Sequence, residues 1–280
     1  MFERLAGNQL VKDALRRMLA AERVPNALIF AGEEGLGKKL FALELAKALN
    51  CRVKSAGIEA CDHCSSCLRI AQLKLPASND AETPKQIIWS EHTDVGLLRP
   101  AGRFILVPQI RELERETNFR PYEGQRRVFL IEEADRLNEA SSNALLKTLE
   151  EAPATSHLIL ITRTPASLLP TIRSRCQTMR FAPLAATEIE AYLIEHRKRS
   201  QREARLVAHL ASGSLGRALE LNLDDYIKQR DWVLGIVEAL IGSVDRSRLL
   251  RAAEELSDAK YKEEYEPRLD VLETLIHDLW

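Results

Sequence analysis

The residues with the clearest chemical potential form a glycine-bearing loop. Gly32, Gly37 and Lys38 fit the spacing G-x-x-x-x-G-K, with Gly35 between them, directly after a short apolar run. A segment with helical spacing of apolar residues follows the loop. In that context the backbone N–H groups of the loop and helix start bind phosphate oxygens, and the lysine reaches the outer phosphates. The pattern predicts a phosphate-binding loop, although a tight strand-to-helix turn would need the same glycines.

Two positions around this loop depart from what hydrolysis requires. A Ser or Thr hydroxyl normally follows the lysine and binds Mg²⁺, but the chain has Lys39 there, which offers the metal no acceptor. Glu132 follows the apolar run at 128–131, where an Asp usually helps to hold Mg²⁺, and Glu133 takes the place of the carboxylate that activates water. We therefore expect ATP or ADP to bind weakly or without hydrolysis.

Four of the five cysteines lie between residues 51 and 67. Cys51, Cys61, Cys64 and Cys67 supply four soft ligands, which makes a closed, structural Zn²⁺ site the simplest interpretation. The three-residue intervals also resemble iron–sulfur spacings, and four reduced thiols without metal are the remaining alternative. His63 could replace one cysteine, but we expect its ring to lie outside the ligand shell.

Short apolar runs alternate with helical patterns through the first two thirds of the chain. Such runs are typical of strands buried on both faces of a parallel sheet. We expect strands at 27–31, 95–98, 104–107, 128–131, 158–161 and 178–181, and helices at 8–22, 38–50, 108–118 and 141–151. Strands that alternate with helices predict an α/β fold with a parallel sheet covered on both sides.

The pattern changes after Pro183, where helical periodicity continues and no strand competes with it. Helices are expected at 187–198, 201–211, 215–222, 225–241, 246–257 and 262–280. A boundary between an α/β unit and an all-α unit is therefore expected at 182–186. The last helix runs to Trp280 with apolar residues and no capping signal, so we expect the natural protein to be longer.

The composition excludes several broad classes of protein. The 280 residues carry 40 Lys and Arg against 41 Asp and Glu, a formal charge of −1, which excludes a polybasic nucleic-acid coat. Hydrophobic residues at 45% and charged residues at 29% are typical of a globular protein. No apolar stretch reaches the ~18 residues of a membrane span and the N-terminus lacks a secretory signal. We expect a cytosolic protein with reduced cysteines and no membrane partner.

Short motifs along residues 1–225 resemble, in order and spacing, those of the AAA+ subunits of bacterial clamp loaders. They are Phe2 with LAGNQ at 5–9, the degenerate phosphate loop, NALLKTLEEAP at 143–153, Thr162 at the sensor-1 position, Ser174-Arg175-Cys176, and GSLGR at 213–217 with Arg217 in the sensor-2 helix. The resemblance implies an α/β AAA+ P-loop core at 1–183 with a zinc module inserted at about 51–75. It further implies an all-α three-helix lid at 184–224 and, at 225–280, the first part of a helical collar for oligomerisation.

The resemblance also implies a function. The chain would belong to the clamp loader of the DNA polymerase III holoenzyme, in a hetero-pentamer with gamma/tau and delta subunits that places the sliding clamp on primer–template DNA. Its setting would be the bacterial cytoplasm, associated with the nucleoid during replication. Gamma/tau-type subunits that hydrolyse ATP are expected to keep the Thr and the Asp-Glu pair that this chain lacks. An ATPase-active subunit and a non-replicative AAA+ assembly protein are the alternatives.

Individual residues take their expected roles from the same resemblance. Arg175 would be an arginine finger that acts in trans on a neighbour's nucleotide, whereas a solvated arginine at a turn is the ordinary alternative. Thr162 and Arg217 would sense nucleotide, and Cys176 is expected to be a small packing residue. Backbone contacts to DNA are expected to draw on Arg99, Arg103, Arg126 and Arg127, although no aromatic pattern supports base recognition.

Overall fold

The computed structural model describes residues 2–53, 58–73, 87–241 and 246–257, with residues 265, 268–269, 271–272 and 275–276 near the C-terminus. Most of the expected helix at 262–280, Trp280 included, lies outside the described residues. So do positions 54–57 and 74–75 of the expected zinc module.

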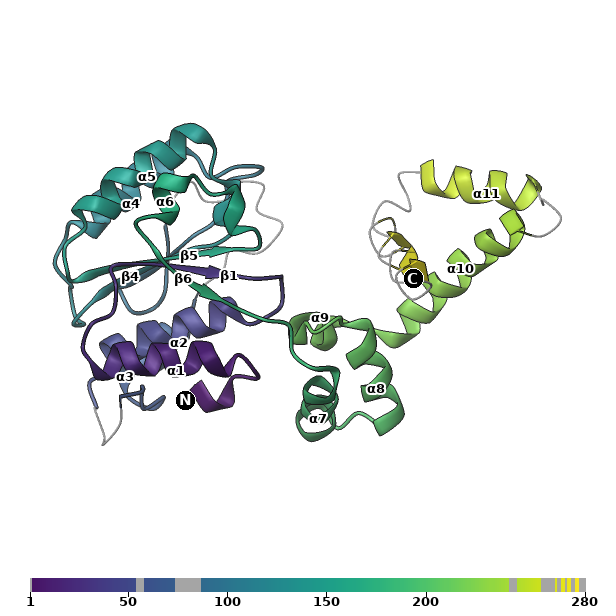
Figure 1. The fold of residues 1–280 in the computed structure, drawn as a ribbon, viewed down its shortest axis with the longest axis horizontal. Helices are drawn as coiled ribbons and strands as arrows, with labels where there is room; N and C mark the ends of the chain where they lie inside the picture. The colour runs from purple at the N-terminus through teal and green to yellow at the C-terminus, as the bar shows by residue number, and fades with distance from the viewer. Residues whose placement is uncertain are drawn as a thin grey trace.

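A six-stranded sheet forms the centre of the first part of the chain, in the order β2-β3-β4-β5-β1-β6 (Figure 1). Its strands are β1 (Ala27–Ala31), β2 (Ile88–Trp89), β3 (Val95–Leu98), β4 (Arg127–Ile131), β5 (Ser156–Thr162) and β6 (Gln177–Arg180). Neighbours pair in parallel, except that β2 is antiparallel to β3. The expected parallel sheet is confirmed, and the added edge strand β2 is too short to give a periodicity signal.

The expectation of a strand at 104–107 is wrong. Phe104 and Ile105 form only isolated bridges with single residues, and α4 (Val107–Thr117) begins at once. Pro108 lies in the first turn of α4, where its fixed φ suits a helix and its missing N–H needs no partner. The chain therefore enters a helix before a strand can pair.

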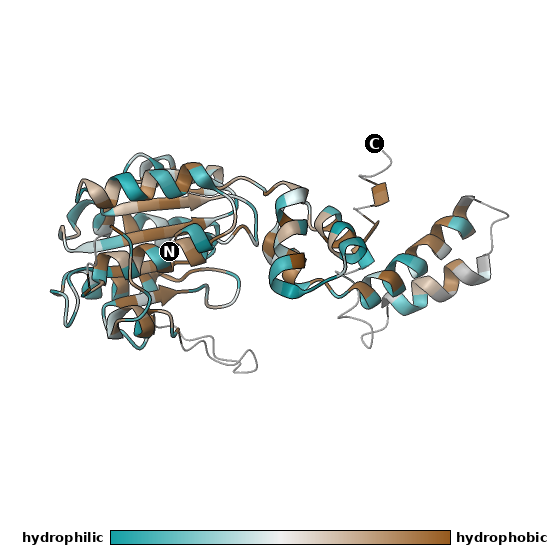
Figure 2. Cartoon of the chain, turned by 90° about the horizontal axis from the view of Figure 1, so that it is seen from below, coloured by the Kyte–Doolittle hydropathy of each residue, from teal (hydrophilic) through white to brown (hydrophobic). Residues whose placement is uncertain are grey.

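Helices cover both faces of the sheet (Figure 1). One face carries α1 (Gln9–Ala20), α2 (Lys38–Asn50) and α3 (Ser65–Ile70); the other carries α4, α5 (Glu139–Glu151) and α6 (Pro170–Arg173). Residues of β4 alternate between the two cores: Val128 and Leu130 join the first, Phe129 and Ile131 the second. Figure 2 shows the strands as mostly hydrophobic, as a sheet buried on both faces requires.

The described chain after β6 is helical, as expected from the sequence. Its helices are α7 (Ala186–Arg197), α8 (Gln201–Leu210), α9 (Leu215–Glu220), α10 (Leu223–Ile241) and α11 (Arg246–Ser257). Helices α7 to α9 share an apolar cluster of their own, which includes Leu193 and Val207. Among the described helices, none is long and apolar enough to cross a membrane.

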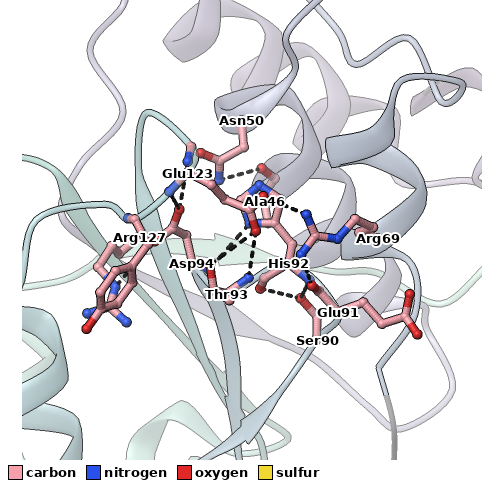
Figure 3. Close-up of polar contacts among 12 residues, drawn as sticks. Ala46, Asn50, Arg69, Ser90, Glu91, His92, Thr93, Asp94, Glu123 and Arg127 are labelled. Atoms are coloured by element: carbon pink, nitrogen blue, oxygen red, sulfur yellow. Dashed lines mark hydrogen bonds and ion pairs between the residues drawn. The ribbon is translucent and has the colours of Figure 1, made fainter.

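A buried polar cluster fixes the far end of α2 (Figure 3). Asp94 is fully buried and accepts the backbone N–H groups of residues 122, 123 and 124 at 2.7, 3.0 and 2.7 Å. Asn50, the last residue of α2, accepts the next two N–H groups of the same loop at 2.9 Å each. The helix that starts at the glycine-bearing loop is thus tied at its other end to the loop at 122–126.

Candidate functional site

The glycine-bearing loop joins β1 to α2, as predicted from its sequence. Backbone φ is +74° at Gly35 and +80° at Gly37, in the left-handed region that glycine adopts without strain. A Cβ at Gly35 would lie 2.1 Å from the hydroxyl oxygen of Ser214, so this position also has no room for a side chain. Helix α2 begins at Lys38 without a side-chain cap, which leaves its first N–H groups for an anion.

The helical part of the chain contacts this loop directly. The Ser214 hydroxyl donates to the carbonyl of Glu34 at 2.9 Å, and the Gly216 N–H donates to the carbonyl of Gly35 at 2.9 Å. Ser214 is part of the GSLGR motif, but no role was predicted for it from the sequence. Its hydroxyl also caps α9 by accepting the Arg217 N–H at 3.2 Å. These bonds hold the start of α9 against the loop.

The amine of Lys38 lies inside the loop. Its Nζ donates to the backbone carbonyls of Gly32 and Glu33, at 2.5 Å each. Burial lowers the pKa of Lys38, and the carboxylates of Glu33 and Asp135 act in the opposite direction. An ammonium has three donors, so phosphate oxygens could take over from these carbonyls without leaving the amine unpaired.

An ion-pair cluster lies where the sequence departs from the pattern expected to bind Mg²⁺. Lys39 Nζ lies 2.9 Å from Glu132 Oε1, and Arg99 Nε lies 2.5 Å from Glu132 Oε2. Both oxygens of the carboxylate are therefore paired with cations of the chain. Mg²⁺ requires oxygen ligands in near-octahedral geometry, and this set of side chains offers it neither a hydroxyl nor a free carboxylate. The residues present do not fit the metal.

The other two predicted polar positions lie beside this cluster. Glu133 adopts φ +47° and pairs with Arg136 at 2.7 Å, on the surface of the cavity. Thr162 ends β5, and its hydroxyl donates to Asp135 Oδ1 at 2.8 Å. Sequence reasoning missed Asp135 because it follows the acidic pair within a short 3-10 turn and gives no periodicity signal.

A cavity of about 460 Å³ brings most of the predicted nucleotide residues together. Its polar part is lined by the loop, Lys39, Glu132 and Thr162. Its apolar part is lined by Leu5, Ala6, Leu184, Leu215 and Leu219. Arg217 is exposed on α9 and is not among the described residues that line the cavity. A cavity lined by both polar and apolar residues suits a ligand with phosphates and a flat base.

Arg175 lies apart from this cavity, just after α6. Its Nε donates to Glu150 Oε1 of α5 at 2.6 Å, and its Nη1 donates to the Thr171 carbonyl at 2.9 Å. The side chain is 36% exposed and that of Glu150 is 50% exposed. The guanidinium is thus held at the surface, where a second protein could reach it. Sequence reasoning did not single out Glu150 as its partner.

The four clustered cysteines converge as their spacing predicts. Their sulfurs all lie within 4.8 Å of one another. The Sγ atoms of Cys51 and Cys64 are 4.0 Å apart, as are those of Cys61 and Cys67. A tetrahedral ion with metal–sulfur bonds of about 2.3 Å requires sulfur separations of roughly 3.8 Å, so the four thiols fit Zn²⁺ closely. They could hold the ion without leaving a position for a reactive ligand.

Neighbouring groups tune these thiols. Burial raises the pKa of Cys64, but backbone hydrogen bonds from Cys67 and Arg52 lower it, with a net value of about 6. His63 is exposed, and its Nδ1 contacts the Cys61 carbonyl at 2.7 Å rather than joining the four sulfurs. This contact agrees with the expectation that its ring lies outside the ligand shell. Cys176 packs against the second core, and burial raises its pKa to about 12, which is typical of an inert packing residue.

The four arginines considered for DNA contacts do not form one basic face. Arg127 is fully buried and pairs with Glu116 at 3.2 Å, so its assignment to a DNA-binding surface is wrong. Arg99 pairs with Glu132 at the cavity beside the glycine-bearing loop, and Arg126 lines a different cavity. Arg103 alone of the four is exposed beside the Phe104 ring. Because the four arginines lie at different places, they do not form a shared basic surface for DNA.

Comparison with known proteins connects these features to replication proteins. A family model described as DNA polymerase III, delta subunit, matches residues 7–185. The DNA polymerase III subunit delta′ of Bacillus subtilis is 33% identical over 231 residues, which cover 82% of this chain and 64% of that protein. The DNA polymerase III subunit tau of Salmonella typhimurium is 33% identical over 267 residues, which cover 92% of this chain and 38% of that protein. The chain thus spans less than two thirds of either relative.

Solved structures extend the likeness to the fold. A RuvB variant of Thermotoga maritima superposes with a TM-score of 0.51 at 16% identity, over 85% of this chain and 66% of that one. At this identity the match establishes the architecture alone. The fold is an AAA+ P-loop α/β core followed by an all-α region, as expected.

Proposed function

Because this chain belongs to the DNA polymerase III delta-subunit family of clamp-loader proteins, we propose that it acts as a delta-prime (δ′) subunit. In this role it hydrolyses little or no ATP itself. It assembles with gamma/tau and delta subunits, supplies Arg175 to a neighbour's nucleotide, and helps to load the sliding clamp onto primed DNA. The setting would be the bacterial cytoplasm, at the nucleoid during replication.

One observation carries the distinction from an ATPase subunit. Lys39 and Arg99 occupy both oxygens of Glu132, the carboxylate that would help to hold Mg²⁺. Without that metal, the charge that develops on a transferred phosphoryl group lacks its main stabiliser. Glu133, the carboxylate that would activate water, pairs with Arg136 at 2.7 Å. The tau relatives are about as similar in sequence, so the delta-prime proposal is supported mainly by this local chemistry.

The arrangement of the remaining parts supports a subunit that acts through its neighbours. We infer that α7 to α9 form the lid and that residues 225–280 begin the collar through which the subunits associate. The cysteine cluster would hold a structural Zn²⁺ that stabilises the described residues around the four thiols. ADP or ATP would bind at the cavity without turnover, contacted by Thr162, with Arg217 as a more distant sensor.

We expect the purified chain to show no ATP turnover above the background of a Lys38→Ala variant. The rest of the phosphate loop is intact, so the expected lack of turnover is attributed to the missing Mg²⁺ ligands. Steady-state phosphate release with excess MgATP measures this directly. Ordinary turnover that Lys38→Ala abolishes would contradict the proposal and favour the ATPase-active alternative.

Glu150 provides a second test, because it holds the Arg175 guanidinium through a charge-assisted hydrogen bond. Glu150→Gln keeps the side-chain length but removes the charge, so the arginine is less well oriented. We expect the rate of ATP hydrolysis by the reconstituted loader to fall by roughly two- to fivefold, which corresponds to the free energy of one exposed ion pair. Single-turnover phosphate release measures the change. Glu151→Gln, on the next exposed residue of α5, is the matched control and should leave the rate unaltered; an unchanged or faster rate in Glu150→Gln would refute this role.

A further inference from the structure

The ion-pair cluster at the phosphate loop has a chemistry of its own. Lys39 comes from the first turn of α2, Glu132 from the end of β4, and Arg99 from the end of β3. The Glu132 side chain is only 12% exposed, whereas those of Lys39 and Arg99 are 27% and 40% exposed. The carboxylate therefore lies beneath the two cations, and all three residues line the cavity. The cations face the space where phosphates would lie.

We propose that this site binds a nucleoside polyphosphate in its metal-free form, with the Lys39 ammonium in the place that Mg²⁺ takes in an active site. The inference rests on the proposed function, because it concerns the nucleotide site of a non-hydrolysing subunit. It goes further by naming the ionic form of the ligand.

The hydrogen-bonding capacity of Lys39 supports this assignment. Its ammonium carries three donors and spends one on Glu132, so the others can reach phosphate oxygens. Lys38 adds a second ammonium from the adjacent position, now bonded to loop carbonyls. A lysine pair can thus neutralise the phosphates without a coordinated metal, because an ammonium acts on phosphate as a compact point charge.

The charge balance of the cluster selects between the two forms of the ligand. Within the ion-pair cluster, Lys39 and Arg99 place two positive charges against the one carboxylate of Glu132. Other carboxylates line the rest of the cavity, those of Glu34, Glu133, Asp135 and Glu220, so the positive charge is local to the cluster. Metal-free ADP carries the full charge of both phosphates, and a bound divalent cation cancels two of these negative charges. Like charges also repel: Mg²⁺ next to the Lys39 ammonium would be destabilised. The site therefore favours the metal-free ligand.

The rest of the cavity fits the organic part of such a ligand. Leu5, Leu184 and Leu219 line its apolar end, beyond the loop. Apolar walls accept the face of a nucleobase and leave recognition to the phosphates. ADP is therefore a suitable probe for the whole cavity.

The test is calorimetric titration of the whole chain with ADP, in one buffer containing EDTA and in another containing excess MgCl₂. We expect ADP to bind in EDTA at least as tightly as in Mg²⁺. Lys39→Thr restores the hydroxyl and removes the ammonium. In this variant we expect binding in EDTA to weaken roughly tenfold, the loss of one charge-assisted hydrogen bond, and to become tighter when Mg²⁺ is added.

Two results would overturn the inference: no ADP binding by the natural chain in EDTA, or binding that is tighter in Mg²⁺ than in EDTA. Lys147→Thr is the matched control, because that lysine pairs with Glu114 on α4 and is not a cavity residue. It should bind ADP as the natural chain does. The readout is separate from that of the proposed function, since Arg175-dependent hydrolysis in the assembled loader would persist even if ADP binding here proved to need Mg²⁺.

Discussion

Replacing Arg175 by alanine is expected to abolish most of the ATP hydrolysis at the neighbouring site of the reconstituted clamp loader. An arginine offered in trans stabilises the charge that develops on the transferred phosphoryl group, and in other nucleotide hydrolases such a residue contributes about 10³–10⁵-fold in rate. The guanidinium of this chain is suitably placed at the surface, held by Glu150 and the Thr171 carbonyl.

The measurement is single-turnover phosphate release by the loader assembled with gamma/tau and delta subunits, with and without primed DNA. The part of the phosphate-release amplitude that comes from the neighbouring subunit's ATP site should disappear, and clamp loading should become slower. Arg173→Ala is the matched control, since that exposed arginine lies two positions away on α6. Both variants should unfold at the same temperature as the natural chain. Normal hydrolysis by an Arg175→Ala assembly would rule out the finger.

The second large effect is expected at the cysteine cluster. Cys64→Ser removes one of the four thiolates that would together hold a structural zinc. Such sites bind the ion with roughly 10–16 kcal/mol in small zinc-binding peptides. The share of one ligand is about 3 kcal/mol, so metal affinity should fall by roughly 10²–10³-fold. Cys64 is also the N-cap of α3, a position that serine suits well, so the helix itself should not suffer.

Elemental analysis of the purified chain, before and after dialysis against a chelator, measures the metal. We expect about one Zn²⁺ per natural chain, a colourless protein, and loss of both metal and thermal stability in Cys64→Ser. Cys176→Ser is the control, because this cysteine packs away from the cluster and should keep the metal. Iron with sulfide, or no metal in protein purified without oxygen, would contradict the zinc assignment.

Much of the fold follows from local sequence. Apolar runs such as 128–131 and 158–161 are typical of strands buried on both faces, and the glycines of the phosphate loop fix the turn that follows β1. The short strand β2 has two residues, and its pairing depends on β3. The strand predicted at 104–107 was wrong because a single short apolar run is compatible with either a strand or the start of a helix. Pro108 favours the helix, which begins at Val107.

The candidate site divides in the same way. Residues were predictable where a motif names them, as at Lys38 and the four cysteines. Their partners were not: the pairs Lys39 with Glu132 and Arg175 with Glu150 join distant segments, and only the folded chain brings them together. Arg127 is the clearest case, because its sequence position beside Arg126 indicates a charged surface. The start of β4 instead buries it, with Glu116 as its ion-pair partner.

Helix α2 has one more consequence. It starts at Lys38 in the phosphate loop and ends at Asn50, next to Cys51 of the metal cluster. Its 13 residues at about 1.5 Å each hold the two ends roughly 20 Å apart. Because Asn50 also ties that end to the loop at 122–126, the separation is rigid. A coloured ion such as Co²⁺ in the thiol cluster would then quench a fluorescent nucleotide at the phosphate loop by a fixed amount. The extent of quenching would measure the distance between the two ends of α2.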